Sequence, residues 1–307
     1  MNRREFLIGS AVAVGAARRS RTQSPDRAKL ARVAIMTYSF DRIIRIPGRP
    51  EEPARTLDLF DIPQMFADRY HVHNVELQHN HLASTEPSYL KDLRGRLAKV
   101  QSRVTNINLE FGNMSITSPD PILRAQAVDL TRQWIDHAIE LGSPRVMVNQ
   151  GSPTPENKDL AIATLKAMGD YGKSKHVMVS MEPRGGGGRG RASAPAAPAA
   201  PVEPAGPPPP APWILLTDII RASGTYANVD IGNFGDQDTQ HAGMRAMFPL
   251  TVGNCHVKLN PARYDLPLAL ALANELGYKG LYSIEAGGSG DSYENVQKIY
   301  EVLLASI

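Results

Sequence analysis

The sequence predicts an α/β fold, a (β/α)8 TIM barrel, and three observations point to it. From residue 32 onward, short β-branched segments alternate with amphipathic helical segments, which is the pattern of parallel strands joined by right-handed crossovers. The last four strand-like segments each stop at a residue that can bind a metal ion. A chain of 307 residues is also long enough for one such barrel, which commonly takes about 250 residues.

Eight segments have the length, the β-branched content and the Gly, Pro or Asn boundaries that are typical of strands. They span residues 33–40, 73–78, 104–109, 145–149, 177–182, 226–230, 253–258 and 281–285. Helices are predicted at residues 89–101, 121–141, 157–171, 214–223, 266–276 and 293–305. Asp120 is the expected cap of the second helix, with Pro121 at its first position and Gly142 at its end.

Residues 1–25 are predicted to form a twin-arginine (Tat) signal peptide outside the fold. Arg3 and Arg4 precede a Phe-Leu step and a mildly apolar run at residues 8–17. That run is too short to span a bilayer as a permanent helix. We therefore expect the twin-arginine export machinery to recognise the leader and the mature protein to be exported to the periplasm. The cleavage site is left open.

The predicted barrel occupies residues 30–307 and is interrupted by a low-complexity insertion at residues 184–212. The insertion contains four consecutive Gly, an Ala-Pro tract and four consecutive Pro. Because it has almost nothing to bury, we expect it to be disordered or partly polyproline II. It follows the fifth strand, and an inert surface spacer is favoured over a lid.

Composition excludes two other classes of protein. The net charge of +3 is small, and the Arg residues are spread along the chain without aromatic interleaving, so no nucleic-acid partner is expected. Cys255 is the single cysteine, which excludes an internal disulfide framework. The fold must therefore be held together by packing, for which a hydrophobic share of 42% is sufficient.

The last four predicted strands have one mixed, largely polar face and one apolar face. Successive side chains of a strand point to opposite faces. The face that carries the terminal metal-binding residue also carries Ser180, Asn228, Asn254 and Ser283, whereas the other face is almost wholly apolar. A sheet with an apolar outside under helices and a polar inside is a closed barrel with a site at the carboxyl ends of its strands.

One metal ion is predicted at these strand ends. The candidate ligands are Glu182, Asp230, His256 and Glu285. This oxygen-rich set favours Mn²⁺, with Mg²⁺, Co²⁺ and Zn²⁺ as alternatives. Four protein ligands on an octahedral ion leave positions for two oxygens of a hydroxy-ketone, whose C–H would become acidic enough for a carboxylate to give an enediolate. Taken singly, Asp230 also fits a turn residue and His256 a hydrogen-bonded core residue.

The order and register of these four residues resemble the xylose-isomerase-like TIM-barrel superfamily, specifically its sugar phosphate isomerase/epimerase branch. The resemblance covers residues 33–307. In that family a Glu, an Asp, a His and a Glu end strands five to eight and bind the metal, and in the epimerases the two Glu form the acid/base pair. The resemblance thus implies metal binding by the four residues and catalysis by Glu182 and Glu285.

The chain departs from the family at three positions. Asn233 stands where epimerases often carry a His, and Leu259 replaces a frequent acidic residue after His-Val-Lys. The Arg expected shortly after the seventh strand appears only as Arg263. These positions contact substrate in the family, so the departures concern the substrate and leave the four metal positions intact.

Other polar groups near the predicted mouth are candidate substrate contacts. They are Tyr38, Glu76, His79, His81, Asn149, Gln150, Asn233, Lys258 and Arg263. The pair His79 and His81 raises the alternative of a second metal, as in the family's endonuclease relatives. Those endonucleases are similar in having a His-rich, multi-zinc pattern and a basic groove, and this sequence shows neither.

The leading hypothesis is a metal-dependent sugar isomerase or epimerase that acts on an unphosphorylated keto-sugar or polyol ketone, because an exported enzyme meets few phosphorylated sugars. A metal-dependent lyase or hydratase on 3-keto-glycosides shares the first enolate step and is the nearest alternative. A catalytically inactive sugar-binding barrel is the third. The expected partner is a small-molecule carbohydrate, and homo-oligomerisation is left open.

Overall fold

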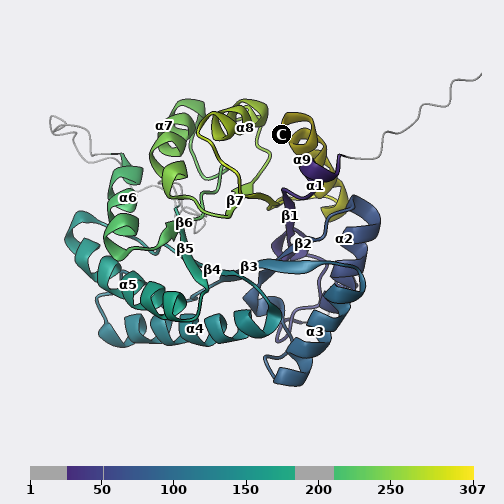
Figure 1. Cartoon of the computed structure of the whole chain (residues 1–307), viewed down its shortest axis with the longest axis horizontal. Coiled ribbons are helices and arrows are strands. Elements are labelled where there is room, and N and C mark those ends of the chain that lie inside the picture. The colour runs from purple at the N-terminus through teal and green to yellow at the C-terminus, as the bar shows by residue number, and fades with distance from the viewer. Residues whose placement is uncertain (1–25, 51, 184–210) are drawn as a thin grey trace, which may run out of the picture.

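The computed structural model describes residues 26–50, 52–183 and 211–307. The predicted Tat leader at residues 1–25 lies outside the described residues, and so does the predicted insertion except for its last two residues. Within the described ranges, the chain forms a ring of helices around eight parallel strands, as Figure 1 shows. None of the helices in these ranges combines the length and the apolar character that crossing a membrane requires.

The eight predicted strands are confirmed, with shorter bounds at several ends. They are β1 (Val33–Met36), β2 (Asn74–Gln78), β3 (Arg103–Leu109), β4 (Arg145–Asn149), β5 (Met178–Glu182), β6 (Tyr226–Ala227), β7 (Asn254–Val257) and β8 (Leu281–Ile284). Every neighbouring pair is parallel, in the order β6-β5-β4-β3-β2-β1-β8-β7. The sheet therefore follows the chain around a barrel.

A seam of isolated bridges joins the two outer strands of this order, β6 and β7. Asp230, beyond the end of β6, forms a parallel bridge with His256 of β7. The amide of His256 donates to the carbonyl of Val229 at 2.9 Å, and the amide of Ile231 donates to the carbonyl of His256 at 3.0 Å. These bonds close the barrel and fix Asp230 beside His256.

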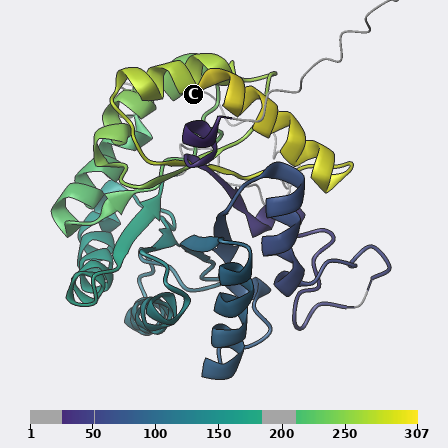
Figure 2. The same ribbon diagram turned by 45° about the vertical axis from the view of Figure 1, so that its right-hand side comes forward.

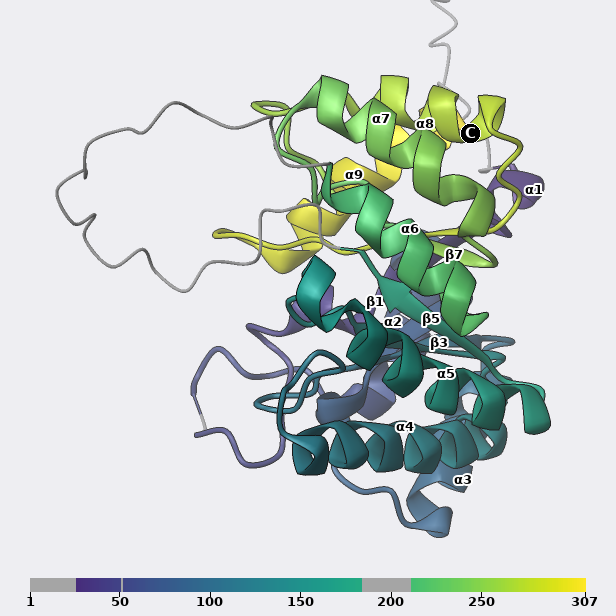
Figure 3. The same cartoon turned by 90° about the vertical axis from the view of Figure 1, so that its left-hand side faces the viewer.

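Most of the helices cover the outside of the strands (Figure 1), whereas α1 lies at one end of the barrel (Figure 3). The helices are α1 (Arg27–Leu30), α2 (Ile62–Tyr70), α3 (Pro87–Lys99), α4 (Pro121–Leu141), α5 (Lys158–Ser174), α6 (Pro212–Ser223), α7 (Gln237–Met247), α8 (Leu266–Glu275) and α9 (Ser292–Ser306). The 3-10 turns are η1 (Thr37–Phe40), η2 (Leu59–Asp61), η3 (His79–His81), η4 (Pro155–Asn157) and η5 (Phe248–Leu250). The predicted cap of α4 is present, because the Asp120 carboxylate accepts the amide of Ile122 and Gly142 is left-handed at φ 74°.

Three features differ from the sequence prediction. The first strand ends at Met36 instead of residue 40, because Ser39 turns the chain: its hydroxyl donates to the carbonyl of Ile284 and accepts the amide of Ala286. The sixth strand has only two regular residues and continues as the seam. Helices α1, α2 and α7 were not predicted: α1 has only four residues, the start signal of α2 is Pro63 in its first turn, and α7 contains Gly243.

The main core lies between the strands and the helices. Outward side chains of the strands, such as Val179, Val257 and Ile284, are fully buried or nearly so and belong to one hydrophobic cluster with the inner faces of the helices. Gly172 of α5 lies against β5 so closely that a side chain there would overlap the carbonyl oxygen of Val177. This close approach positions β5 relative to α5, and with it Glu182 at the end of the strand.

The two ends of the barrel are structurally different. Figure 3 shows α1 at one end, where the strands begin, and the connection from η1 to η2 at the other. Figure 2 shows that this connection reaches away from the strands. The site described next lies at the end where the strands finish, since β5 ends at Glu182 and Glu285 directly follows β8.

Candidate metal centre

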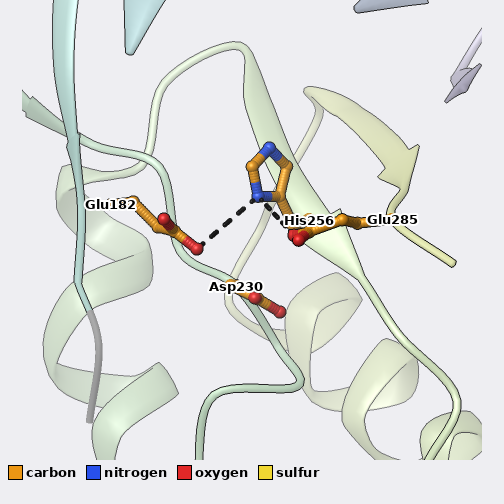
Figure 4. A group of neighbouring side chains, drawn as sticks. All are labelled: Glu182, Asp230, His256 and Glu285. Atoms are coloured by element: carbon orange, nitrogen blue, oxygen red, sulfur yellow. Dashed lines mark ion pairs between the residues drawn. The ribbon is translucent and has the colours of Figure 1, made fainter. Parts of the chain in front are cut away.

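The four predicted metal ligands lie together at the carboxyl ends of β5 to β8. Each offers one ligand atom, and these atoms lie within 4.8 Å of one another. Glu182 and Glu285 are 3% exposed, and Asp230 and His256 are fully buried. Figure 4 shows the imidazole of His256 between the two Glu carboxylates, with Asp230 beside them. Within the described ranges, this is the one group of His, Cys, Asp and Glu side chains with such a geometry.

His256 is held from below by a buried carboxylate. Its Nε2 lies 2.8 Å from Oε1 of Glu76, a residue of β2 on the other side of the barrel. Nδ1 faces the other way, 3.1 Å from Oε2 of Glu285 and 3.9 Å from Oε1 of Glu182. A proton on Nε2 therefore leaves the lone pair of Nδ1 pointing toward the carboxylates.

The charges of Glu76 and His256 depend on each other. Burial alone would lower the pKa of His256, but the negative charge of Glu76 and the nearby carboxylates of Glu182 and Glu285 raise it well above its ordinary value. Burial alone would raise the pKa of Glu76, but the charge of His256 and the hydrogen bonds of its neighbours lower it. Each of the two residues therefore stabilises the charged form of the other.

A layer of amides surrounds Glu76. Asn106 donates to its Oε1 at 3.0 Å, and Asn254 donates to its Oε2 at 3.0 Å. Asn254 also donates to Oδ1 of Asn228 at 3.0 Å. The barrel interior is thus polar, as the strand parity predicts. Glu76 lies beneath the four candidate ligands, deeper than the mouth position predicted for it, and it supports His256.

Asp230 is fixed by its own loop and by a lysine. Its Oδ1 accepts the amide of Gly232 at 2.7 Å, and its Oδ2 contacts the ammonium group of Lys258. Burial raises the pKa of Asp230, and the nearby Glu285 and Glu182 raise it further, whereas Lys258 acts in the opposite direction. A buried carboxylate in this position needs a cation close to it.

Lys258 and Asn233 connect the carboxylates. The ammonium of Lys258 lies 3.2 Å from Oε2 of Glu285 and 3.3 Å from Oδ1 of Asn233. The amide of Asn233 in turn donates to Oε1 of Glu182 at 3.0 Å. The two predicted substrate contacts therefore lie within the cluster. An ammonium contacts Glu285, while a neutral amide contacts Glu182.

The cluster fits a divalent cation on two observations. Nδ1 of His256 is buried and has no hydrogen-bond partner among the described residues, although it lies close to two carboxylates. Three carboxylates and one imidazole form the hard, oxygen-rich donor set that Mn²⁺ or Mg²⁺ prefers. Glu182, Asp230, His256 and Glu285 are therefore the residues that would hold the ion.

The other predicted substrate contacts are in different places. Tyr38 lies in η1 just after β1 and is partly buried. Asn149 ends β4 in register with Glu182 and donates to Oε2 of Glu110 at 2.8 Å. Gln150 follows it and is partly buried. Arg263 is exposed in the turn after β7. Tyr38 and Asn149 thus lie at the strand ends, whereas Arg263 is on the surface.

The two histidines after β2 have structural partners. Nδ1 of His79 accepts the amide of Glu110 at 3.1 Å, and its ring packs edge-on against Trp134 of α4. His81 is buried, with Nδ1 3.0 Å from Oγ1 of Thr37 and Nε2 3.1 Å from Oδ1 of Asp41. His79 therefore faces the helix layer instead of the predicted mouth, and neither histidine belongs to the candidate metal group.

Glu110 is the main residue at this end that sequence reasoning missed. It follows β3, is partly buried and is held by Asn149. Its position after a strand that ends Asn-Leu was a signal, because polar residues at strand ends of a barrel face the mouth. The parity of β2 was a second signal: Asn74, Glu76 and Gln78 share the inward face, which turns the next side chain, His79, outward.

Comparison with known proteins identifies the fold through solved structures. No protein-family model matches the chain, and no curated protein matches it either. The chain is similar to D-allulose 3-epimerase from Methylomonas sp. in complex with D-allulose, at 13% identity and a TM-score of 0.61, over 90% of this chain and 97% of that one. It is similar to a sugar phosphate isomerase/epimerase from Parabacteroides distasonis, at 13% identity and a TM-score of 0.63, over 89% and 93% of the two chains.

A third similar structure is the apo form of 3-keto-D-glucoside 4-epimerase from E. coli. It shares 11% identity and a TM-score of 0.60, over 90% of this chain and 99% of that one. At such low identity the likeness shows the fold alone. The chain has the α/β TIM-barrel-like fold that these sugar isomerases and epimerases share.

Proposed function

We propose that this chain is a metal-dependent sugar isomerase or epimerase that acts by enediolate chemistry on an unphosphorylated keto-sugar or polyol ketone. The observation that carries the proposal is the meeting of Glu182, Asp230, His256 and Glu285 at the ends of neighbouring barrel strands. A divalent cation, Mn²⁺ in our proposal, would polarise the substrate carbonyl when bound there. Two carboxylates within the same cluster can then act on the adjacent C–H.

The two Glu residues are suited to opposite halves of a proton transfer. Glu182 comes from β5 and Glu285 from β8, and they lie on either side of His256 (Figure 4). One carboxylate removes a proton from one face of the carbon next to the carbonyl, and the other returns a proton to the opposite face. Lys258 stabilises the charged form of Glu285, and Asn233 orients Glu182.

The substrate class is supported by the neighbouring cavity and by the similar structures. A cavity of about 230 Å³ borders Lys258 and Glu285 and is lined further by Asn260 and Tyr264. The similar protein from Methylomonas sp. is an epimerase of D-allulose, which is a keto-sugar. We assign a small carbohydrate of this kind as the substrate.

A second candidate is a metal-dependent lyase or hydratase on 3-keto-glycosides. The fold of 3-keto-D-glucoside 4-epimerase favours it, because that protein acts on a 3-keto-D-glucoside. Removal of a proton from a carbon next to the carbonyl by Glu182 or Glu285 would begin either reaction. In elimination the electron pair expels the aglycone, whereas in epimerisation the proton returns.

Export to the periplasm is part of the proposal. The paired Arg3 and Arg4 before an apolar run support it. Replacing both with Lys should keep the full-length precursor in the cytoplasm. Periplasmic mature protein from the double variant, at the level seen with the natural leader, would contradict this assignment.

The proposal is tested by solvent exchange. Protein loaded with Mn²⁺ is incubated in D₂O with a panel of keto-sugars and 3-keto-glucosides, and deuterium at the carbon next to the carbonyl is measured by NMR. Glu182→Gln should lower this exchange by at least about 100-fold while the protein still binds Mn²⁺. Glu275→Gln, a surface glutamate paired with Arg245, is the matched control.

Each outcome separates the alternatives. Unchanged exchange in the Glu182→Gln variant refutes its role as a base. Release of aglycone from a 3-keto-glucoside, without a new epimer, identifies the lyase. Sugar binding without exchange or aglycone release identifies a binding protein and overturns the proposed activity.

A further inference from the structure

A second cavity lies at the opposite end of the barrel, where the strands begin. Its volume is about 800 Å³, larger than that of the cavity beside Lys258. The segments that lead into β1, β3, β4, β7 and β8 all contribute to its wall. The proposed metal chemistry uses none of these residues, so the cavity calls for a separate explanation.

The wall of this cavity carries only positive charge. Arg32, Arg103, Arg145 and Lys279 line it, and no Asp or Glu is among the lining residues. Arg103 and Arg145 are the first residues of β3 and β4, and Arg32 directly precedes β1. We call this set the basic cluster. Like charges gathered around one cavity repel each other and favour an anion among them.

The guanidinium groups of the cluster are bonded to neutral oxygens. Nε of Arg103 donates to Oδ1 of Asn74 at 2.9 Å, Nη1 of Arg145 donates to the carbonyl of Thr105 at 2.8 Å, and Nη2 of Arg32 donates to the carbonyl of Tyr278 at 2.9 Å.

These bonds orient the three groups without neutralising them. The ion pairs of the described residues involve other arginines, such as Arg245 with Glu275 at 2.9 Å. The positive charge of the cluster therefore has no carboxylate counter-ion among the described residues.

Arg145 is the most confined member of the basic cluster. Its Nε is buried and has no hydrogen-bond partner among the described residues. Burial lowers its pKa, Tyr278 and Glu76 act in the opposite direction, and the charge of Arg103 lowers it again. Gly253, at φ +83°, leaves room for the guanidinium, because a side chain at this position would overlap it. Gly253 thus lets the guanidinium of Arg145 lie at the cavity wall, where an anion in the cavity would offset its charge.

We propose that the basic cluster binds a small oxyanion of the phosphate type. Guanidinium groups match the oxygens of such an anion in bidentate geometry, and three of them around one cavity surround a tetrahedral group better than a planar one. The site is independent of the proposed metal centre and lies at the other end of the strands. Its ligand is either free phosphate or the phosphate group of a larger metabolite, which fits a cavity of about 800 Å³.

The test is a titration of the metal-loaded protein with three probes at constant ionic strength. Inorganic phosphate, glucose 1-phosphate and citrate are each titrated by calorimetry, and the melting temperature is measured in parallel. We expect phosphate to bind and to raise the melting temperature more than chloride does. Tighter binding of glucose 1-phosphate would identify a phosphorylated metabolite as the ligand, and equal binding of the two would identify free phosphate.

Matched variants locate the binding. Arg103→Gln and Arg145→Gln should each weaken phosphate binding by about tenfold or more, because each removes a charged donor. Arg245→Gln, a surface arginine paired with Glu275, should leave the affinity unchanged. Repeating the titration on chelator-stripped protein should also leave it unchanged, which excludes phosphate bound to the metal ion.

Three results would overturn the proposal. They are a melting shift no larger than that of chloride, phosphate affinity retained in both cluster variants, and preferential binding of citrate. If either variant fails to fold, crystals of the natural protein soaked in selenate decide the question. Anomalous density among Arg32, Arg103 and Arg145 supports the site, and its absence there refutes it.

Discussion

Lys258 occupies a position that sets how tightly the proposed cation can bind. Its ammonium contacts Asp230 and lies 3.2 Å from Glu285, so it shares two carboxylates with the ion. A cation held by the same two carboxylates would lie close to this ammonium. Replacing Lys258 with Met removes the competing charge but keeps most of the volume. We therefore predict that the variant binds Mn²⁺ more tightly than the natural protein.

The size of the effect follows from the geometry. At an effective dielectric constant of 20, a single and a double positive charge about 5 Å apart repel by roughly 7 kcal/mol. The Lys258 side chain is 20% exposed and has a flexible stem, so it can swing toward solvent and avoid most of this repulsion. The remaining cost of binding the cation is that Lys258 loses its contacts with Asp230 and Glu285, which is worth about 1.4 to 3 kcal/mol. The Mn²⁺ affinity should thus rise by about 10- to 100-fold.

Two measurements check this prediction. Mn²⁺ is titrated by calorimetry into chelator-stripped protein, and deuterium exchange of the keto-sugar is followed in the same samples. Affinity should rise while exchange falls, because Lys258 also stabilises the charged form of Glu285. Lys166→Met is the control, since this exposed lysine pairs with the surface residue Asp170. Equal or weaker Mn²⁺ binding by Lys258→Met would refute the idea that the ammonium and the ion share these carboxylates.

Two further predictions concern stability. Gly172→Ala should lower the free energy of unfolding by about 1 to 3 kcal/mol, because the added methyl group overlaps the carbonyl of Val177. Gly95→Ala, at an open position of a helix, should raise the free energy of unfolding by up to about 1 kcal/mol. Both values are measured by urea titration, and changes of the same sign in the two variants would contradict this. Burial lowers the pKa of His79 to about 4. Below pH 6.5 the His79 ring therefore takes up a proton in the unfolded chain but stays neutral in the folded protein. The free energy of unfolding should fall between pH 6.5 and 4 by up to about 3 kcal/mol. His79→Gln should flatten this fall in urea titrations at pH 7 and 4.5, and an unchanged slope would contradict it.

The eight strands and the meeting of the four candidate ligands could be predicted because both follow from local rules. Alternation of strands with helices fixes parallel pairing, and side-chain parity fixes which residues share the interior. Glu182 and Glu285 therefore meet although 103 positions separate them (285 minus 182). In a regular barrel, the order of the strands alone predicts which strand ends are neighbours, whatever the loops are.

The helices and the loops were harder to predict from sequence. Helix α7 (Gln237–Met247) is polar and contains Gly243, and Phe234 packs closely against that glycine. Such a tertiary contact overrides a weak propensity. The roles of Glu76 and Lys258 depend on partners from distant strands, 180 positions away in the case of Glu76 and His256. No local pattern specifies which of several inward polar residues will lie beneath the site and which will line it.

The seam between β6 and β7 couples the closure of the barrel to the binding of a cation. The amides of His256 and Ile231 hold the ring of strands together on both sides of Asp230. Any breathing motion that parts these strands also pulls a carboxylate away from its imidazole neighbour. A cation bound to both Asp230 and His256 would stabilise the contact between β6 and β7. By reciprocity, any change that stabilises this contact would raise the affinity for the cation. Slower hydrogen exchange at these two amides is thus a direct gauge of occupancy in solution.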